Sequence, residues 1–380
     1  MTKDQVRGYS WGWLRRILPH KKDRDQASQS ERWPVLQIET TSRCSMRCVF
    51  CPNKALGQEW LHGDLPWQVY RDHIGPHLAR FDLAYLQGWG EPLLHPHLWD
   101  MVRQAKSAGC QVGFTTCGGL LDEEKGQRLL DEGINILSIS FAGASKSTHE
   151  SLRVGSDFLK LATNVERLSK QRANFQNSSL KLELFFLMMR PNIRELPAFV
   201  RLAASLGADE VAATNVAYAP TPEIESRGVF AATPDPEYQA IVAESEQEAG
   251  RLGLQLRVYP LTMDDNILEC DAKPTEMAFI NHLGAVTPCV YLGLPVKDSA
   301  PRFFQGKNYP VPPVSFGNVR AGLIEALQGQ SRATFVAPFR ARKAFAYSAL
   351  ALSAASGMGQ DMRLPDPPSP CRHCYKLYGV

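Results

Sequence analysis

The hydrophobic positions of residues 35–255 alternate between helix-like and strand-like periodicities. Apolar residues recur at the spacing of an amphipathic helix, as at Leu98, Met101 and Val102, and Gly109 marks the expected end of that helix. Short apolar or β-branched runs, typical of buried strands, occur between the helical patterns at 35–39, 83–86, 111–115, 136–140, 181–187 and 210–214.

This alternation predicts the fold class. Six strand-like runs, each followed by a helical pattern or a long loop, indicate an α/β fold with a parallel sheet and helical crossovers. We expect a partial (β/α)6 barrel of TIM-like type, whose chemistry lies at the C-terminal ends of the strands. After Gly253 one further strand-like run precedes a loop-rich, proline-rich segment. The expected domains are an N-terminal arm at 1–34, the barrel at 35–255, and a small C-terminal domain at 256–380.

Charge and composition exclude some functions and partners. The formal net charge of +3 is too small to indicate a nucleic-acid partner. No apolar run reaches the ~20 residues that a transmembrane helix requires, and the N-terminus lacks the apolar core of a signal peptide. The most apolar segment, 344–355, is interpreted as a buried helix. These observations predict a cytoplasmic protein without a transmembrane segment.

The N-terminal arm leaves two interpretations open. Trp11 and Trp13 lie beside the basic residues Arg15 and Arg16. A short helix with this composition can rest on a membrane surface, which would give a peripheral membrane contact. Alternatively, the arm packs its tryptophans against the main domain.

Three of the nine cysteines lie within eight residues: Cys44, Cys48 and Cys51. They follow the first expected strand on its C-terminal side, where an active-site loop is expected. A [4Fe–4S] cluster commonly takes four thiolates, and a structural zinc ion takes four ligands, usually as two separated pairs. A Cys-x3-Cys-x2-Cys triplet can hold three corners of a cluster and leave the fourth iron open. The alternative is a loop stapled by zinc.

The triplet, with Phe50 before its last cysteine, resembles the signature of radical S-adenosylmethionine (SAM) enzymes. The resemblance implies a [4Fe–4S] cluster whose open iron binds SAM. It also implies reductive cleavage of SAM to a 5′-deoxyadenosyl radical that abstracts a substrate hydrogen, with reduced flavodoxin or ferredoxin as the electron donor. The cofactor carries the chemistry, and the protein orients and shields it.

Segments after the second and fourth expected strands resemble further motifs of this family. In "LQGWGEPLLHP", Gly88 and Gly90 are expected to let the backbone approach SAM closely, and Glu91 is expected to accept a hydrogen bond from its ammonium group. In "SISFAGASKSTHESLR", the resemblance makes Ser140 a candidate contact to the SAM carboxylate. Ala142 stands where related proteins often carry aspartate, so the substrate does not follow from the family at large.

The C-terminal cysteines resemble a second family feature. Cys270, Cys289, Cys371 and Cys374 follow the pattern of the SPASM region in its shorter "twitch" form. The resemblance implies an auxiliary [4Fe–4S] cluster that is fully ligated and serves as an electron acceptor. A four-thiolate zinc site is the rival interpretation, since Cys-x2-Cys is common there too.

Of three further residues inside the barrel region, one has a structural interpretation alone and two keep a structural and a functional interpretation side by side. Cys110 is expected to be a small buried residue. Cys117, at the C-terminal end of the third expected strand, either packs in the core or faces a substrate cavity. Glu183, inside an otherwise apolar strand, is either a proton acceptor or half of a buried ion pair.

The function predicted from these features is the oxidation or radical modification of an unactivated carbon, with the auxiliary cluster as electron acceptor. The 34 residues before the first expected strand favour a small biosynthetic metabolite as substrate over a peptide, because peptide-modifying relatives often carry an added N-terminal leader-recognition domain. Two alternatives remain, a peptide-modifying maturase of the RiPP type and a non-catalytic metal-binding interaction protein.

Overall fold

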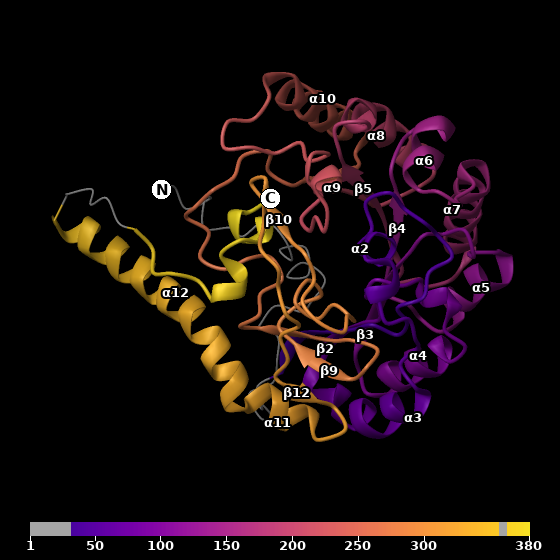
Figure 1. Ribbon diagram of the computed structural model, residues 1–380. Helices are drawn as coiled ribbons and strands as arrows, with labels where there is room; N and C mark the ends of the chain where they lie inside the picture. Colours follow the sequence, from indigo (N-terminus) through magenta and orange to yellow (C-terminus); the bar gives the residue numbers. More distant parts are fainter. Residues whose placement is uncertain (1–31, 357–362) are drawn as a thin grey trace.

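A computed structural model of the chain describes residues 32–356 and 363–380 (Figure 1). The expectations for Trp11, Trp13 and the rest of 1–31 lie outside the described residues. A ten-stranded sheet runs through the described part in the order β12-β9-β8-β1-β2-β3-β4-β5-β6-β7, and a separate hairpin pairs β10 with β11. Helices follow the strands along the chain, as the alternating pattern predicts.

All six predicted strands are confirmed, and each pairs in parallel with its neighbour in the sequence. Their bounds are β1 (Trp33–Ile38), β2 (Phe81–Tyr85), β3 (Gln111–Thr116), β4 (Ile136–Phe141), β5 (Lys181–Met188) and β6 (Glu210–Asn215). The parallel order brings the C-terminal ends of all six strands to one edge of the sheet. This edge carries the loop of the cysteine triplet.

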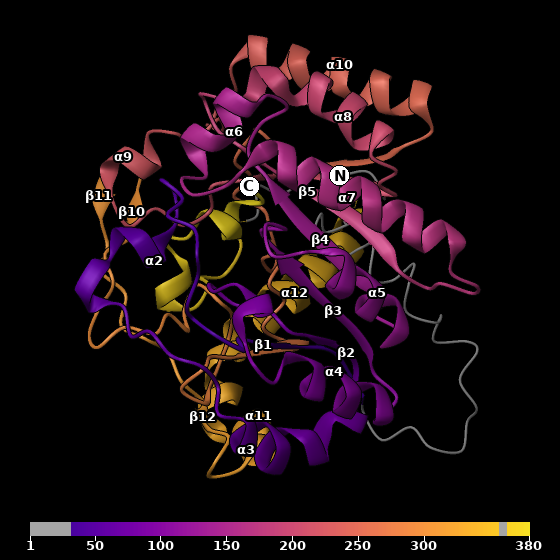
Figure 2. The ribbon, with the colours of Figure 1, turned by 90° about the vertical axis from the view of Figure 1, so that its right-hand side faces the viewer.

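The helices lie around the outer face of the curved sheet (Figure 2). The longer ones there are α4 (Leu98–Ser107), α5 (Glu123–Asp131), α7 (Phe158–Asn174), α8 (Leu196–Ser205) and α10 (Pro236–Leu252). Helix α4 is followed by Gly109 at φ +79°, a left-handed conformation that glycine adopts without strain, so the predicted helix end is confirmed. Alternate strand residues, such as Leu137, Ile139 and Phe141 of β4, are buried in the core between sheet and helices.

The C-terminal region joins both edges of the barrel sheet. Strand β7 (Gln255–Val258) pairs in parallel with β6, and β8 (Met277–Ile280) pairs in parallel with β1 at the other edge. The antiparallel strands β9 (Ala285–Thr287) and β12 (Gly317–Asn318) extend the β8 edge. The sheet is therefore a partial barrel, as predicted, and the expected domain boundary at 255/256 falls within continuous pairing.

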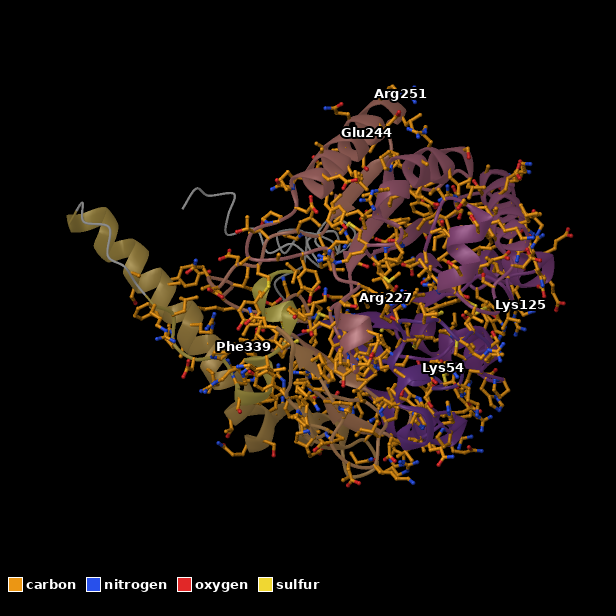
Figure 3. All side chains as sticks on the ribbon, turned by 45° about the horizontal axis from the view of Figure 1, so that its top comes forward. Lys54, Lys125, Arg227, Glu244, Arg251 and Phe339 are labelled. Carbon is orange, nitrogen blue, oxygen red and sulfur yellow. The ribbon has the colours of Figure 1, made fainter. Side chains whose placement is uncertain are left out.

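Helix α12 (Gln330–Ser356) projects from the body (Figure 1). Its first half is anchored: Phe339, labelled in Figure 3, is fully buried and clusters with Leu292 and Cys371. Phe345 and Tyr347 are 37% and 63% exposed, so the prediction of a buried helix at 344–355 is wrong for these residues. Beyond its anchored turns the helix projects from the rest of the fold, so these two side chains have little packed against them (Figure 1). None of the helices in the described ranges has the length and apolar character needed to cross a membrane.

Candidate functional site

The loop of Cys44, Cys48 and Cys51 begins directly after β1 and is fixed on two sides. On the side of the segment that follows β2, the Glu91 N–H donates to the carbonyl of Arg43 at 2.8 Å. On the other side, the N–H groups of Arg47 and Val49 donate to the carbonyls of Val154 and Leu152, at 2.8 and 3.0 Å. The loop is therefore held by segments that follow β2 and β4, and its thiols sit where these segments meet.

The three thiols lie in a partly dehydrated site. Burial raises the pKa of Cys44 to about 11 and that of Cys51 to about 12, and the neighbouring Cys48 thiol raises both further. Thiols with such pKa values are neutral at pH 7, and a bound metal would replace their protons. Three cysteines on one short loop that lose protons on metal binding fit a cluster held at three corners.

Arg153 lies against this loop and was missed by the sequence reasoning. Its Nη1 lies 4.0 Å from Cys48 Sγ, and its guanidinium carbon lies 5.5 Å from the centre of the Phe50 ring. Its Nε is buried and donates no hydrogen bond within the described part of the chain. A permanent positive charge with a free buried donor suits an anionic group at this position. The only signal in the sequence was its place in the segment that follows β4.

Gly88 and Gly90 pack closely against residues at and after the end of β1. A Cβ atom on Gly88 would lie 2.5 Å from Glu39 Cβ, and one on Gly90 would lie 2.2 Å from the carbonyl oxygen of Thr41. Both glycines are therefore required because the loop after β2 packs directly against the end of β1 and the following residues. The expected close approach to SAM gains no support from these contacts.

Glu91 joins the loop after β2 to the end of β3. Its carboxylate is 2% exposed and accepts hydrogen bonds from Thr116 Oγ1 at 2.7 Å, the Cys117 N–H at 2.7 Å and the Leu93 N–H at 3.1 Å. The structure thus gives Glu91 a positioning role that the sequence reasoning did not assign. The expected contact to the SAM ammonium group stays a prediction.

Cys117 and Cys110 lie at opposite ends of β3. Burial, followed by the charge of Glu91, raises the pKa of Cys117 far above its usual range, and the Cys44 thiol contributes to the same shift. Cys117 is buried, which supports the packing interpretation, and a role facing a substrate cavity stays a prediction. Cys110 is buried, with Sγ 3.1 Å from the carbonyl oxygen of Leu78, and the prediction of a buried structural residue is confirmed.

The inner face of the sheet carries Ser140 and a buried ionic network. Ser140 is half-buried near the C-terminal end of β4, on the same face as Ser138. Ser138 Oγ donates to Glu183 at 2.7 Å, and Arg257 binds Glu183 at 2.6 Å and Glu210 at 2.9 Å. The ion-pair interpretation of Glu183 is therefore confirmed. Burial raises the pKa of its carboxyl group, which the positive charge of Arg257 opposes.

The four C-terminal cysteines converge from three segments of the chain. Burial raises the pKa of Cys270 well above its usual range, and the thiols of Cys371, Cys289 and Cys374 each add to the shift. The fully buried Arg302 lowers the pKa of Cys289 and Cys371, so its positive charge lies beside them. Four thiols close enough to shift one another's pKa fit a fully ligated centre.

Neither cysteine group has the geometry of a single-ion site. Within residues 32–356 and 363–380, no set of three or more His, Cys, Asp or Glu side chains is arranged to hold one metal ion.

The comparisons with known proteins agree with this site. Residues 38–180 match the Radical SAM superfamily model. The chain is 26% identical over 288 residues to the tungsten-containing aldehyde ferredoxin oxidoreductase cofactor-modifying protein of Pyrococcus furiosus, covering 75% of this chain and 78% of that protein. It is 25% identical to the PqqA peptide cyclase of Granulibacter bethesdensis, over 48% of this chain and 47% of the cyclase.

A solved structure shares the fold. SuiB of Streptococcus suis bound to S-adenosylmethionine matches with a TM-score of 0.54 at 12% identity, over 68% of this chain and 60% of SuiB. The chain thus spans about half of the cyclase and less than two thirds of SuiB. At this identity the likeness to SuiB concerns the fold alone.

The partial barrel and the cysteine loop at its strand ends agree with this match. Residues 38–180 are a radical SAM domain, and the chain is an enzyme. This domain implies a [4Fe–4S] cluster and SAM as cofactors.

Proposed function

We propose that Cys44, Cys48 and Cys51 hold a [4Fe–4S] cluster with one open iron, at which SAM binds. The observation that carries the proposal is the position of three cysteines in the loop that follows β1, where backbone hydrogen bonds to the segments after β2 and β4 hold the loop. Bound there, the cluster and SAM supply a radical that can abstract hydrogen from an unactivated carbon.

The surrounding residues bind and orient SAM in this proposal. Arg153 supplies a buried positive charge, and Ser140 presents a hydroxyl from the inner face of β4, so both can meet the SAM carboxylate. Glu91 holds the ends of β2 and β3 together and has a carboxylate for the ammonium group. Buried aliphatic and aromatic side chains around the strand ends, including Met189 and Ala142, exclude water from this side.

We further propose that Cys270, Cys289, Cys371 and Cys374 hold an auxiliary [4Fe–4S] cluster in a SPASM/twitch-like region at 256–380, beside a barrel at 35–255. The four thiols are close enough to raise the pKa of Cys270 together, which supports this proposal. With four protein thiolates the cluster has no open iron. Its role is then to accept the electron that a substrate radical releases when it also loses a proton.

The proposed substrate is a small biosynthetic metabolite. The P. furiosus relative, named as a cofactor-modifying protein, matches over 78% of its length, whereas the PqqA peptide cyclase matches over 47%. The longer match favours a small molecule, such as a cofactor precursor. A peptide is the second candidate, because the cyclase and the mycofactocin maturase of Mycobacterium ulcerans are both among the relatives. Reduced flavodoxin or ferredoxin stays the predicted electron donor, and the cytoplasm stays the predicted compartment.

Two measurements test these proposals. Anaerobic reconstitution is expected to give about 8 irons per chain, and about 4 irons with one or two zinc ions would refute the auxiliary cluster. Incubation with SAM and dithionite is expected to release 5′-deoxyadenosine, and a Cys48→Ala variant is expected to release none. A wild-type chain with a full iron content that leaves SAM intact would be the non-catalytic metal-binding protein of the alternative.

A further inference from the structure

Trp89, in the loop after β2, links the two cysteine groups. Its backbone N–H donates to Glu39 Oε1 at 2.9 Å, at the end of β1, five residues before Cys44. Its indole N–H donates to the carbonyl of Val290 at 3.0 Å. Val290 directly follows Cys289 in the sequence. One side chain thus spans from the loop that packs on the triplet segment to the segment of the C-terminal centre.

Aromatic rings continue this link towards the four C-terminal thiols. The ring centres of Trp89 and Tyr291 are 5.8 Å apart with an interplanar angle of 73°, an edge-to-face contact. Tyr291 and Tyr218 are stacked at 6.3 Å, and Trp89 and Tyr218 are 6.4 Å apart. Tyr291 lies two residues after Cys289, so its contact with Trp89 brings the Trp89 ring to the segment that carries one C-terminal thiol.

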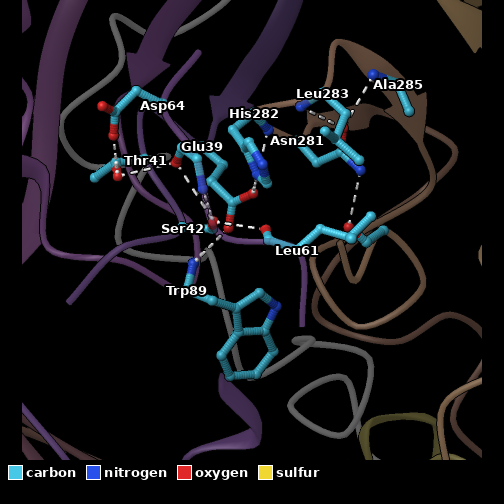
Figure 4. A network of polar contacts seen from close by, with 12 residues as sticks. Glu39, Thr41, Ser42, Leu61, Asp64, Trp89, Asn281, His282, Leu283 and Ala285 are labelled. Carbon is cyan, nitrogen blue, oxygen red and sulfur yellow. Dashed lines mark hydrogen bonds and ion pairs between the residues drawn. The ribbon is translucent and has the colours of Figure 1, made fainter. Parts of the chain in front are cut away.

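A buried carboxylate holds Trp89 in place (Figure 4). Glu39 is fully buried, and its Oε2 accepts from the His282 N–H at 3.1 Å and lies 3.0 Å from His282 Nδ1. His282 follows β8 and opens the turn that leads through β9 to Cys289. Glu39 therefore ties the loop of Trp89 to the hairpin that carries one C-terminal ligand. Such a pair is costly to bury unless its hydrogen bonds are satisfied, as they are here.

We propose that Trp89 is the contact through which electrons pass between the two cysteine centres, with Glu39 and His282 as positioning residues that hold it. The inference rests on the proposed function, because it needs both clusters. One electron leaves the reduced centre and reduces the other, and no bond forms or breaks and no proton moves. Trp89 is not itself consumed. Electron transfer favours a packed, hydrogen-bonded route because the electronic coupling falls steeply across each empty gap.

The experiment needs no substrate. The fully reconstituted chain, without SAM, is photoreduced by about one electron, frozen at intervals, and examined by electron paramagnetic resonance, with Cys48→Ala and Cys371→Ser chains as references for the signal of each centre alone. Trp89→Leu removes both the ring contact and the indole hydrogen bond, and Trp89→Phe removes only the hydrogen bond. We expect a marked fall in the rate of redistribution between the centres in Trp89→Leu and a smaller fall in Trp89→Phe, at unchanged reduction potentials.

Trp60→Phe is the matched control. The Trp60 ring lies 6.3 Å from that of Trp89, and its Nε1 donates no hydrogen bond within the described ranges. This variant is expected to redistribute electrons at the wild-type rate. An unchanged rate in Trp89→Leu with both clusters present would overturn the inference. If Trp89→Leu fails to fold, an unchanged rate in Trp89→Phe overturns it instead, because the indole bond is then shown to be dispensable. A wild-type chain without a second cluster would instead overturn the proposed function.

Discussion

Removing the negative charge of Glu91 is expected to destabilise the protein even when no cofactor is bound. In Glu91→Gln, the remaining carbonyl oxygen can still accept from Thr116 Oγ1 and the Leu93 N–H, which share Oε1 in the wild type. The amide nitrogen then faces the Cys117 N–H, which donates to Oε2 at 2.7 Å in the wild type. One buried donor loses its acceptor and meets a second donor.

The size of the effect follows from the number of hydrogen bonds lost. A buried donor without a partner costs about 1–3 kcal/mol, so Glu91→Gln is expected to lose about that much stability. Glu91→Ala orphans all three donors and leaves a cavity, so its loss is expected to exceed about 3 kcal/mol. Urea unfolding of the metal-free chain measures both as a lower midpoint at an unchanged slope.

Glu166→Gln is the control for this measurement. Glu166 forms an exposed ion pair with Lys170 on α7, and such pairs contribute about 0–1 kcal/mol. If Glu91→Gln unfolds at the wild-type midpoint, the carboxylate is not a structural joint between β2 and β3. Its burial would then have to be explained by ligand binding alone.

Three further predictions follow from other contacts. Cys371→Ser is expected to reduce the iron content from about 8 to about 4 per chain, while SAM still perturbs the spectrum of the remaining cluster. Loss of all iron would contradict the proposal that the two centres are independent. Buried His149 has its pKa lowered to about 3 by burial and by the charge of Arg153, so the unfolded chain takes up the proton first as the pH falls below about 6.5. The contribution of His149 to the free energy of unfolding should therefore be fully present above pH 6.5 and be lost as the pH falls towards 3, by about 2 kcal/mol at pH 5. The His149→Gln variant should lack this loss. Equal dependence of the unfolding free energy on pH in the two proteins would contradict the reasoning. Gly90→Ala places a Cβ 2.2 Å from a backbone oxygen that cannot rotate away, so we expect thermal unfolding to show a stability loss of at least about 1–3 kcal/mol. In the control variant Gly250→Ala nothing lies within 4 Å of the new Cβ, so no steric cost is expected.

The sequence by itself determined the features that depend on local periodicity and spacing. Each strand from β1 to β6 was predicted within about two residues at either end, because a buried parallel strand is a short apolar run between turn signals. The end of α4 at Gly109 was predicted because the left-handed position favours glycine. The triplet was recognised because its three ligands lie on one short loop, so their proximity is already present in the chain.

Tertiary structure alone decided the contacts between segments distant in the sequence. The pairing of β8 with β1 depends on how the chain returns across the barrel, which no local pattern encodes. The partners of Glu91 and the position of Arg153 arise in the same way, from strand ends that the parallel sheet gathers at one edge. The apolar segment of α12 was misjudged because exposure depends on what packs against a helix, and its own sequence does not specify that neighbour.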